Sequence, residues 1–184
     1  FIGSNLTEKI ITEADKVIVI DNLITGDTKN IAKFQKEDNF KYIEHDIQES
    51  IYFDEKIDYV VHLASCASPK AYSKYPINTL KSGSIGTINA LGISKRHKAK
   101  FFLASTSEIY GDPEVSPQSE NYWGNVNTLG PRSMYDESKR FAESAVHAYV
   151  QTHGITGNIA RIFNTYGPNM QINDGRVVTN FIYQ

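Results

Sequence analysis

The sequence predicts an α/β fold built on a doubly wound parallel sheet, and three observations lead to this prediction. Short apolar runs that suit buried strands alternate along the chain with longer segments of helical periodicity. Several of these runs consist of β-branched or aromatic residues, as strands buried on both faces do. No internal repeat or low-complexity segment interrupts the alternation. Because strands that alternate with helices run parallel through right-handed crossovers, we expect one domain over residues 1–184.

The composition excludes several function classes. The chain has 184 residues, of which 40% are apolar and 22% charged, as in ordinary globular domains. A net charge of −2 provides no basic field for nucleic acid or an anionic membrane surface, so we expect no nucleic-acid partner. Cys66 is the single cysteine, which excludes an internal disulfide and a cysteine-based zinc site, and we expect no metal. No apolar run approaches the roughly 18 residues of a membrane span.

The first two predicted elements contain a nucleotide-binding spacing. Residues 1–14 place Gly3 among apolar residues at helical spacing, and residues 17–20 form a β-branched strand that ends in Asp21. An acidic residue about 20 positions after the glycine that opens the preceding helix is typical of a carboxylate that binds an adenosine ribose. Such a carboxylate would repel a 2′-phosphate, which favours NAD over NADP. A helix and a strand followed by a turn aspartate is the structural alternative.

The next two predicted strands also end in polar or small residues. Residues 25–27 predict a turn before a short polar helix, and residues 40–44 predict a strand that ends in His45 and Asp46. Residues 58–65 predict a strand that runs into small residues, which would let a cofactor approach the backbone. Asp46 would lie where an adenine amino group could be recognised, although a turn aspartate fits the sequence equally well.

Residues 77–98 predict a long helix with two distinct faces. Its apolar stripe comprises Ile77, Leu80, Ile88 and Leu91. Beside that stripe, within an arc of about 80°, lie Lys81, Asn89, Gly92 and Arg96. Two cations and an amide on one face could bind an anion, and a solvated helix flank is the alternative.

The second half of the chain places polar groups after a strand and ahead of a helix. Residues 101–104 predict a strand that leads into hydroxyl residues 105–107 and Glu108, at the edge where open α/β sheets bind ligands. Residues 111–132 lack periodicity, and long connections of this kind are usually functional. Residues 158–164 predict the last strand, and residues 177–183 read as helical.

Tyr135 and Lys139 are the residues on which the functional prediction depends. They are four positions apart at the start of a predicted helix, so both side chains can point into one site. A free tyrosine has a pKa of about 10, and a nearby cation lowers that pKa. The pair therefore predicts a tyrosine that acts as a base, whereas a scattered Tyr and Lys on an amphipathic helix is the alternative.

Together these residues resemble the extended short-chain dehydrogenase/reductase family, and within it the UDP-glucuronate decarboxylases. The general part of the match is the Tyr-x-x-x-Lys pair with Gly3, Asp21 and the hydroxyl-rich strand end. The specific part is STSEIYGDPEVSPQSE over 105–120, YWG over 122–124, GPR over 130–132, YDE over 135–137, ARIFNTYGP over 160–168 and NDGRVV over 173–178. The resemblance covers the whole chain and implies an NAD-binding Rossmann fold.

The resemblance also implies a reaction. Hydride would leave C4 of the UDP-glucuronate sugar for NAD while Tyr135 takes the hydroxyl proton, Lys139 lowers the tyrosine pKa and holds the nicotinamide ribose, and Thr106 binds the same sugar oxygen. The 4-keto acid would lose CO2 with help from Ser107 and Glu108, and return of the hydride would give UDP-xylose. Related dehydratases carry Thr-Asp-Glu here, so Ser107 argues against the alternatives, a nucleotide-sugar 4-epimerase or a 4,6-dehydratase.

By the same resemblance, two groups of binding residues are expected. The NAD site would comprise Phe1, Ile2, Gly3, Asp21, Asn22, Thr25, Gly26, Asp46, Ile47, Leu63, Ala64, Ser65, Ser82, Ala104, Tyr135, Lys139, Thr165 and Arg176. The nucleotide-sugar site would comprise Lys81, Asn89, Gly92, Lys95, Arg96 and Tyr149.

The ends of the chain and the family pattern indicate a partial domain. Phe1 is not a start methionine and Gln184 stands in an apolar helical stretch, so we expect a fragment that lacks the first strand and the smaller carboxyl-terminal substrate domain. The helix over 77–98 and the Tyr135 helix resemble a pair that forms a four-helix interface, so we expect a homodimer. A cytoplasmic location is expected if the source is bacterial, and the Golgi lumen if it is eukaryotic with an amino-terminal anchor.

Overall fold

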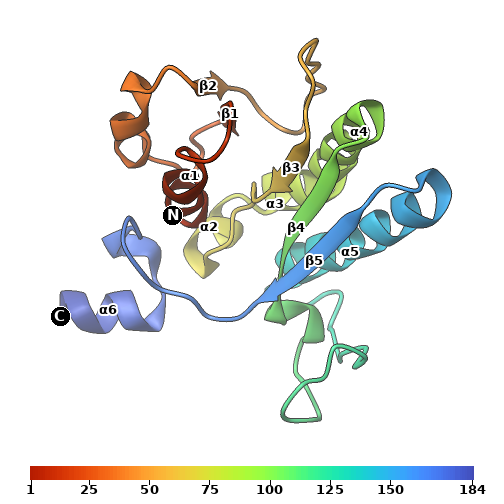
Figure 1. Ribbon diagram of the computed structural model, residues 1–184. Coiled ribbons are helices and arrows are strands. Elements are labelled where there is room, and N and C mark those ends of the chain that lie inside the picture. Colours follow the sequence, from red (N-terminus) through yellow and green to blue (C-terminus); the bar gives the residue numbers. More distant parts are fainter.

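The computed structural model describes the backbone of residues 1–184 and every side chain except that of Tyr183. Two parallel sheets form its centre (Figure 1). One pairs β1 (Val17–Asp21) with β2 (Phe40–Glu44), and the other has the order β3 (Tyr59–His62), β4 (Lys100–Thr106) and β5 (Gly157–Ile162). All five strands overlap the predicted runs, β4 extends two residues beyond its predicted end, and every ladder is parallel. The predicted α/β fold with parallel strands is therefore confirmed.

The interruption between the two sheets lies between β1 and β3. Within the described residues the sheet order gives no hydrogen-bonded pairing between these strands, and Figure 1 shows their neighbouring edges with no strand between them. In the doubly wound order the first strand occupies that position. The break in the sheet is thus consistent with the expectation that this chain lacks the first strand.

Six helices connect or flank the strands. They are α1 (Ile2–Ile10), α2 (Pro69–Lys74), α3 (Pro76–Lys81), α4 (Thr87–His97), α5 (Ser133–His153) and α6 (Val177–Tyr183). A π-helical turn over Ser82–Gly86 joins α3 to α4, so the three segments form the predicted long helix. Helix α2 was not predicted, although Ser68 caps it and Pro69 opens it, which is an ordinary helix-start signal. Among the described residues every helix is too short or too polar to cross a lipid bilayer.

Helices α4 and α5 pack against one face of the three-stranded sheet. Phe101 and Leu103 of β4 are fully buried there against Leu91 of α4 and Val146 of α5. A second cluster joins α1 to β1 and β2 around Val17. These two cores hold the carboxyl ends of the strands at one edge of the molecule, where ligands bind in open α/β sheets.

The predicted apolar stripe of the long helix is not the face that packs in the core. Ile77 is 60% exposed and Leu80 39% exposed, and of the four stripe residues only Leu91 is buried. Gly83 faces α5 instead, and a Cβ there would be 2.5 Å from the Ser138 Cβ, so the two helices are in close contact. The π turn also adds a residue to the helical period, which rotates α4 relative to α3.

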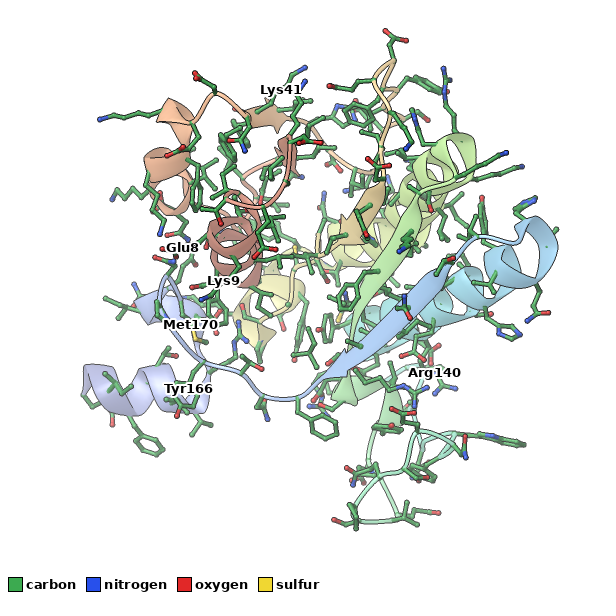
Figure 2. All side chains as sticks on the ribbon, viewed as in Figure 1. Glu8, Lys9, Lys41, Arg140, Tyr166 and Met170 are labelled. Carbon is green, nitrogen blue, oxygen red and sulfur yellow. The ribbon has the colours of Figure 1, made fainter. Side chains whose placement is uncertain are left out.

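The segment after β5 crosses the molecule to reach α1 (Figure 1). Asn5 donates from Nδ2 to the Pro168 carbonyl at 2.9 Å, and Gln171 donates from Nε2 to the Thr25 carbonyl at 2.8 Å. Figure 2 shows Tyr166 and Met170 of this segment in the region between α1 and α6. The crossing brings residues 165–176 to the edge at which β1 ends.

Candidate active site

Tyr135 and Lys139 lie together beside the end of β4. Both are buried, with 6% and 4% of their surface exposed. The Lys139 Nζ atom is 6.0 Å from the centre of the Tyr135 ring and donates to the Ala104 carbonyl at 2.8 Å. The first two turns of α5 therefore place the phenol and the ammonium in one site, as their spacing predicts.

The acidity of this pair differs from the expectation. Burial raises the pKa of Tyr135, and hydrogen bonding with the Thr106 side chain opposes that rise. Burial also lowers the pKa of Lys139 to about 8. The prediction that Lys139 makes Tyr135 more acidic than a free tyrosine is wrong for this chain by itself, because the cost of burying a phenolate outweighs the stabilisation that its neighbours provide.

The residues after β4 form a 3-10 turn, Ser107–Tyr110, that Thr106 caps. The Thr106 hydroxyl accepts from the Glu108 amide at 3.3 Å, which fixes the turn against the strand end. Glu108 forms an ion pair with Arg132 at 2.7 Å, just before α5 begins. The predicted trio of residues 106–108 thus lies at the same strand end as Tyr135.

Three neighbours of this site were not predicted from the sequence. Arg132 pairs with Glu108, and the ring of Tyr72 from α2 stacks on that of Tyr135, with centres 5.2 Å apart and planes 15° apart. Asp136 is 6% exposed, its Oδ1 atom has no partner among the described residues, and burial raises its pKa to about 6. The Ser68-Pro69 helix start marks the position of α2, but no sequence signal placed Tyr72 on Tyr135.

Residues that could contact a cofactor lie at the ends of β1, β2 and β3. Asp21 ends β1 with an exposed carboxylate that accepts from the Leu23 amide at 2.7 Å. Asn22 donates to Asp46 at 3.0 Å, which joins the ends of β1 and β2. The Ser65 hydroxyl after β3 is buried and has no partner among the described residues. Such an unpaired buried group is a candidate ligand contact.

The remaining cofactor candidates come from both ends of the chain. Phe1, Ile2 and Gly3 open α1, and a Cβ on Gly3 would be 3.6 Å from Leu63. Arg176 donates from Nη2 to Asp174 at 3.0 Å, and its charge opposes the rise that burial causes in the pKa of Tyr135. Arg176 therefore lies within electrostatic reach of Tyr135. In the described part of the chain, no group of three or more His, Cys, Asp or Glu side chains could hold a metal ion.

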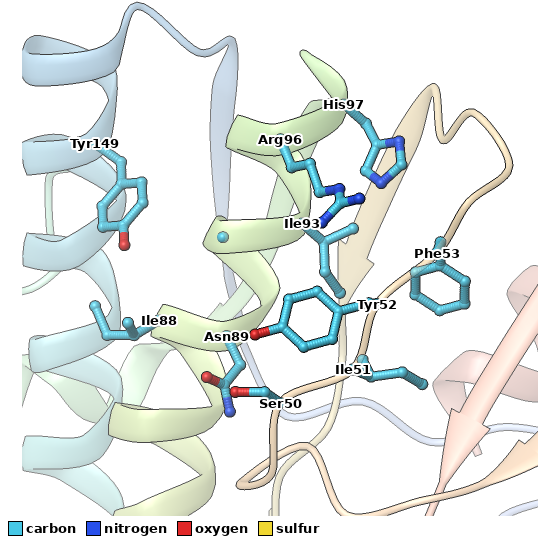
Figure 3. A pocket seen from close by; sticks show the side chains of 11 residues that line it. Ser50, Ile51, Tyr52, Phe53, Ile88, Asn89, Ile93, Arg96, His97 and Tyr149 are labelled. Carbon is cyan, nitrogen blue, oxygen red and sulfur yellow. The ribbon is translucent and has the colours of Figure 1, made fainter.

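The predicted nucleotide-sugar residues gather elsewhere. Four of the six, Asn89, Gly92, Arg96 and Tyr149, line a cavity of about 360 Å³. Figure 3 shows Tyr52 reaching toward α4 from the segment 50–53, and Arg96 lies 5.8 Å from the centre of its ring. Tyr149 comes 14 positions after Tyr135 on α5, which is about 21 Å along the helix.

This cavity lies toward the edge of the sheet at which the strands begin. Helix α5 starts beside the end of β4 and runs back toward that edge, and Tyr149 is in its last two turns. The Asn89 side chain is already engaged, since its Nδ2 atom donates to the Ile47 carbonyl at 2.8 Å. The structure therefore does not bring these four residues to Tyr135, and their role in sugar binding stays a prediction.

Comparisons with known proteins agree with this geometry. The family described as GDP-mannose 4,6 dehydratase matches residues 1–184. UDP-glucuronic acid decarboxylase 1 of Xenopus tropicalis is 52% identical over 184 residues, which are 100% of this chain and 43% of that protein. The chain thus spans less than half of this curated relative.

Solved structures give the same arrangement of elements. UDP-glucose 4-epimerase of Thermotoga maritima, solved with UDP-glucose, matches with a TM-score of 0.85 at 28% identity over 98% of this chain and 58% of its own. UDP-glucuronic acid 4-epimerase of Bacillus cereus, solved with NAD, matches with a TM-score of 0.79 at 28% identity over 94% of this chain and 56% of its own.

Proposed function

Because the chain belongs to the GDP-mannose 4,6 dehydratase family of extended short-chain dehydrogenases/reductases, we propose that its whole protein converts UDP-glucuronate to UDP-xylose and CO2 with a bound, recycled NAD. One observation carries the proposal: Tyr135, Lys139 and Thr106 meet at the end of β4. The 52% identity to a UDP-glucuronic acid decarboxylase supports this substrate over other nucleotide sugars.

The residues at the strand ends fit NAD. The exposed Asp21 carboxylate would bind the adenosine ribose, and Asp46 with Asn22 would lie beside the adenine. The unpaired Ser65 hydroxyl offers a buried polar contact. Lys139 has three ammonium donors, of which the Ala104 carbonyl takes one, so two are free for a ribose. When bound, NAD supplies the acceptor and later the donor of the C4 hydride.

The side chains of this chain would manage the protons. As hydride leaves C4 of the sugar, Tyr135 would take the proton of the C4 hydroxyl as phenolate, which requires that the positive charge of bound NAD lower its raised pKa, and Thr106 would donate a hydrogen bond to the same oxygen. The product is a ketone β to the sugar carboxylate. When CO2 leaves, the electrons of the broken carbon–carbon bond move onto the C4 oxygen, where Tyr135 and Thr106 stabilise the enolate. Protonation at C5 and return of the hydride complete UDP-xylose, so the net reaction consumes one proton and no redox equivalent.

Ser107 and Glu108 would act on the carboxyl side of the sugar. Their turn begins directly at Thr106, so both side chains leave the backbone next to the residue that binds the C4 oxygen. Arg132 pairs with Glu108 and neutralises its charge, so that carboxylate would repel an anionic substrate less. A 4,6-dehydratase or a 4-epimerase is the second candidate, and the serine at position 107 argues against the dehydratase.

Incubation of the full-length protein with UDP-glucuronate and NAD tests the proposal. We expect released CO2 and a UDP-pentose, each measured against time. Recovery of the C4 epimer with its carboxylate intact would reject decarboxylation and favour the epimerase. The Arg96→Ala variant addresses the separate cavity, because it should raise the KM for UDP-glucuronate if those residues bind the nucleotide and leave it unchanged if they do not.

We further propose that the protein is a homodimer, on the basis of the exposed apolar stripe. Ile77, Leu80 and Ile88 of the long helix are exposed, and Phe141 of the neighbouring α5 is 45% exposed. Paired helices with such faces suit a four-helix interface. Sedimentation of the full-length protein tests this, and Leu80→Glu should convert a dimer to a monomer.

A further inference from the structure

We propose that Glu143 is a positioning residue, which holds helix α5 on strand β4 so that Tyr135 and Thr106 meet. The proposal deepens the decarboxylase function given above and rests on it. Glu143 comes eight positions after Tyr135, about 12 Å along the helix, so it acts through the positions of other groups.

The spacing of three side chains on α5 supports this role. Tyr135, Lys139 and Glu143 follow one another at intervals of four, so they lie along one face of the helix. Each contacts the last residues of β4. Lys139 donates to the Ala104 carbonyl at 2.8 Å, Glu143 accepts from the Ser105 hydroxyl at 2.5 Å, and Tyr135 lies close enough to Thr106 for that side chain to lower its pKa. The catalytic pair and Glu143 thus share one seam between helix and strand.

Arg161 joins the next strand to the same carboxylate. It stands opposite Ser105 in the ladder between β4 and β5. Its Nε atom donates to Glu143 Oε1 at 3.1 Å and its Nη2 atom to Oε2 at 2.8 Å, which is a two-pronged pair. The two side chains are 14% and 25% exposed, so solvent weakens the pair little. One carboxylate therefore connects α5, β4 and β5.

Arg161 extends the network to the far side of the catalytic turn. Its Nη1 atom donates to the Tyr110 hydroxyl at 2.9 Å and to the Glu120 carbonyl at 2.7 Å. Tyr110 is the last residue of the turn that begins with Ser107. Ser105, which precedes Ser107 and Glu108, therefore bonds directly to Glu143. Tyr110, which follows them, is connected to Glu143 through Arg161.

Arg140 secures the same turn independently. Its Nη1 atom donates to the carbonyls of Ile109 and Trp123, both at 2.9 Å, and Figure 2 shows it beside the segment that follows the turn. Arg140 pairs with Glu137 only at 3.9 Å, and both side chains are more than one third exposed. Glu137 therefore gives a matched control, a carboxylate on the same helix whose only ion pair is long and exposed and which makes no contact with Ser105 or Arg161.

The first experiment compares Glu143→Gln with Glu137→Gln in the full-length protein. Loss of the charge on Glu143 leaves Arg161 without its partner and weakens the contact of α5 with β4 and β5. A displacement of about 1 Å can cost about 100-fold in rate, so we expect kcat for CO2 release to fall about 10- to 100-fold while the Kd for NAD stays within about threefold. Glu137→Gln should match the wild type in both constants.

The second measurement distinguishes positioning from simple stabilisation. The phenol of Tyr135 is titrated by ultraviolet absorbance, as the difference between each protein and the same protein carrying Tyr135→Phe. Because the Thr106 side chain lowers the pKa of Tyr135, moving the two groups apart should shift the Tyr135 midpoint to higher pH in Glu143→Gln and leave it unchanged in Glu137→Gln. A lower melting temperature with wild-type kcat and an unchanged midpoint would overturn the proposal.

Ser105→Ala decides the question if Glu143→Gln fails to fold. It keeps the pair of Glu143 with Arg161 and removes only the bond to β4, so we expect a smaller fall in kcat, about 3- to 10-fold, and an upward shift of the midpoint. Wild-type values of both would contradict the role of Glu143. If the wild-type protein releases no CO2 from UDP-glucuronate, the proposed function fails, and the titration still decides on Glu143.

Discussion

The Lys139 Nζ atom lies 2.8 Å from the Ala104 carbonyl oxygen and 6.0 Å from the centre of the Tyr135 ring. The ammonium is therefore held by the backbone of β4 and reaches toward the phenol from that anchor. Burial lowers the pKa of Lys139 to about 8 and raises that of Tyr135. The burial of these two side chains lowers the stability of the folded protein. The hydrogen-bonding capacity that they do not use is available to a ligand.

Replacement of Tyr135 by phenylalanine should abolish turnover and preserve cofactor binding. The variant keeps the ring that stacks on Tyr72 and removes only the hydroxyl that would take the proton. Loss of a general base typically costs about 10²- to 10⁴-fold, so we expect kcat for CO2 release to fall by that amount. NAD affinity, measured by fluorescence titration, should stay within about threefold of the wild type.

The control for that variant is Tyr59→Phe. Tyr59 is 65% exposed at the start of β3, so loss of its hydroxyl should change neither constant. Near-normal turnover of Tyr135→Phe would show that another group takes the proton.

Lys139→Met should inactivate the protein and stabilise it at neutral pH. The folded chain binds this proton with a pKa of about 8 and the unfolded chain with the ordinary 10.5, so the burial of the charge costs about 3 kcal/mol at pH 7. The Ala104 carbonyl loses its partner in the variant, which returns part of that cost, so we expect a net gain of about 1–2 kcal/mol.

The pH dependence gives an independent check on Lys139. Between pH 8 and 10.5 the unfolded wild type holds more protons than the folded protein, so the free energy of unfolding should rise with pH over that range. Urea unfolding at several pH values measures it. The Lys139→Met variant should lack this rise, and a parallel dependence in both proteins would contradict the assignment.

Local patterns in the sequence predicted the strands and the proximity of Tyr135 and Lys139. The β-branched run before Asp21 and the spacing of Tyr135 and Lys139 depend on neighbouring positions only, so they can be recognised without the fold. The pair of Glu143 with Arg161 joins residues 18 positions apart on different elements, and no local period marks it. It follows from the alignment of α5 on β5, which only the folded chain establishes.

Burial explains why the expectation for the acidity of Tyr135 was wrong. A cation near Tyr135 predicts a more acidic phenol, but the outcome depends on how much water the fold removes, and the sequence does not contain that quantity. An apolar stripe such as that of Ile77 and Leu80 marks a face that avoids water, but a core face and a face for a partner have the same period. Gly83 identifies the side of the long helix that packs against α5, because only small residues permit the close approach to Ser138.

Asp136→Asn should raise stability at neutral pH. Burial raises the carboxyl pKa to about 6; the charges of Glu108 and Glu137 raise it further, and those of Arg132 and Arg140 lower it. The folded protein therefore holds more protons than the unfolded chain between pH 4 and 6, and the wild type should lose stability as pH rises through that range.

The neutral amide carries no such penalty. We expect Asp136→Asn to gain about 1–2 kcal/mol at pH 7 and to show a flatter profile between pH 4 and 6 in urea unfolding. A less stable variant at pH 7 would mean that the charged carboxylate has a partner in the folded protein.

Gly83 and Gly92 should respond in opposite directions to alanine, although both lie on the long helix. A Cβ on Gly83 would stand 2.5 Å from the Ser138 Cβ and 2.9 Å from the Ser138 carbonyl oxygen, so α5 must shift. Overpacking of this kind costs about 1–3 kcal/mol. A Cβ on Gly92 meets nothing within 4 Å, and alanine in a helix is favoured over glycine by about 0.5–1 kcal/mol. Thermal unfolding of both variants should place Gly92→Ala above the wild type and Gly83→Ala below it. Equal melting temperatures would show that the π turn and α5 lie farther apart than this contact requires, and the alignment that places Lys139 beside β4 would then lose its support.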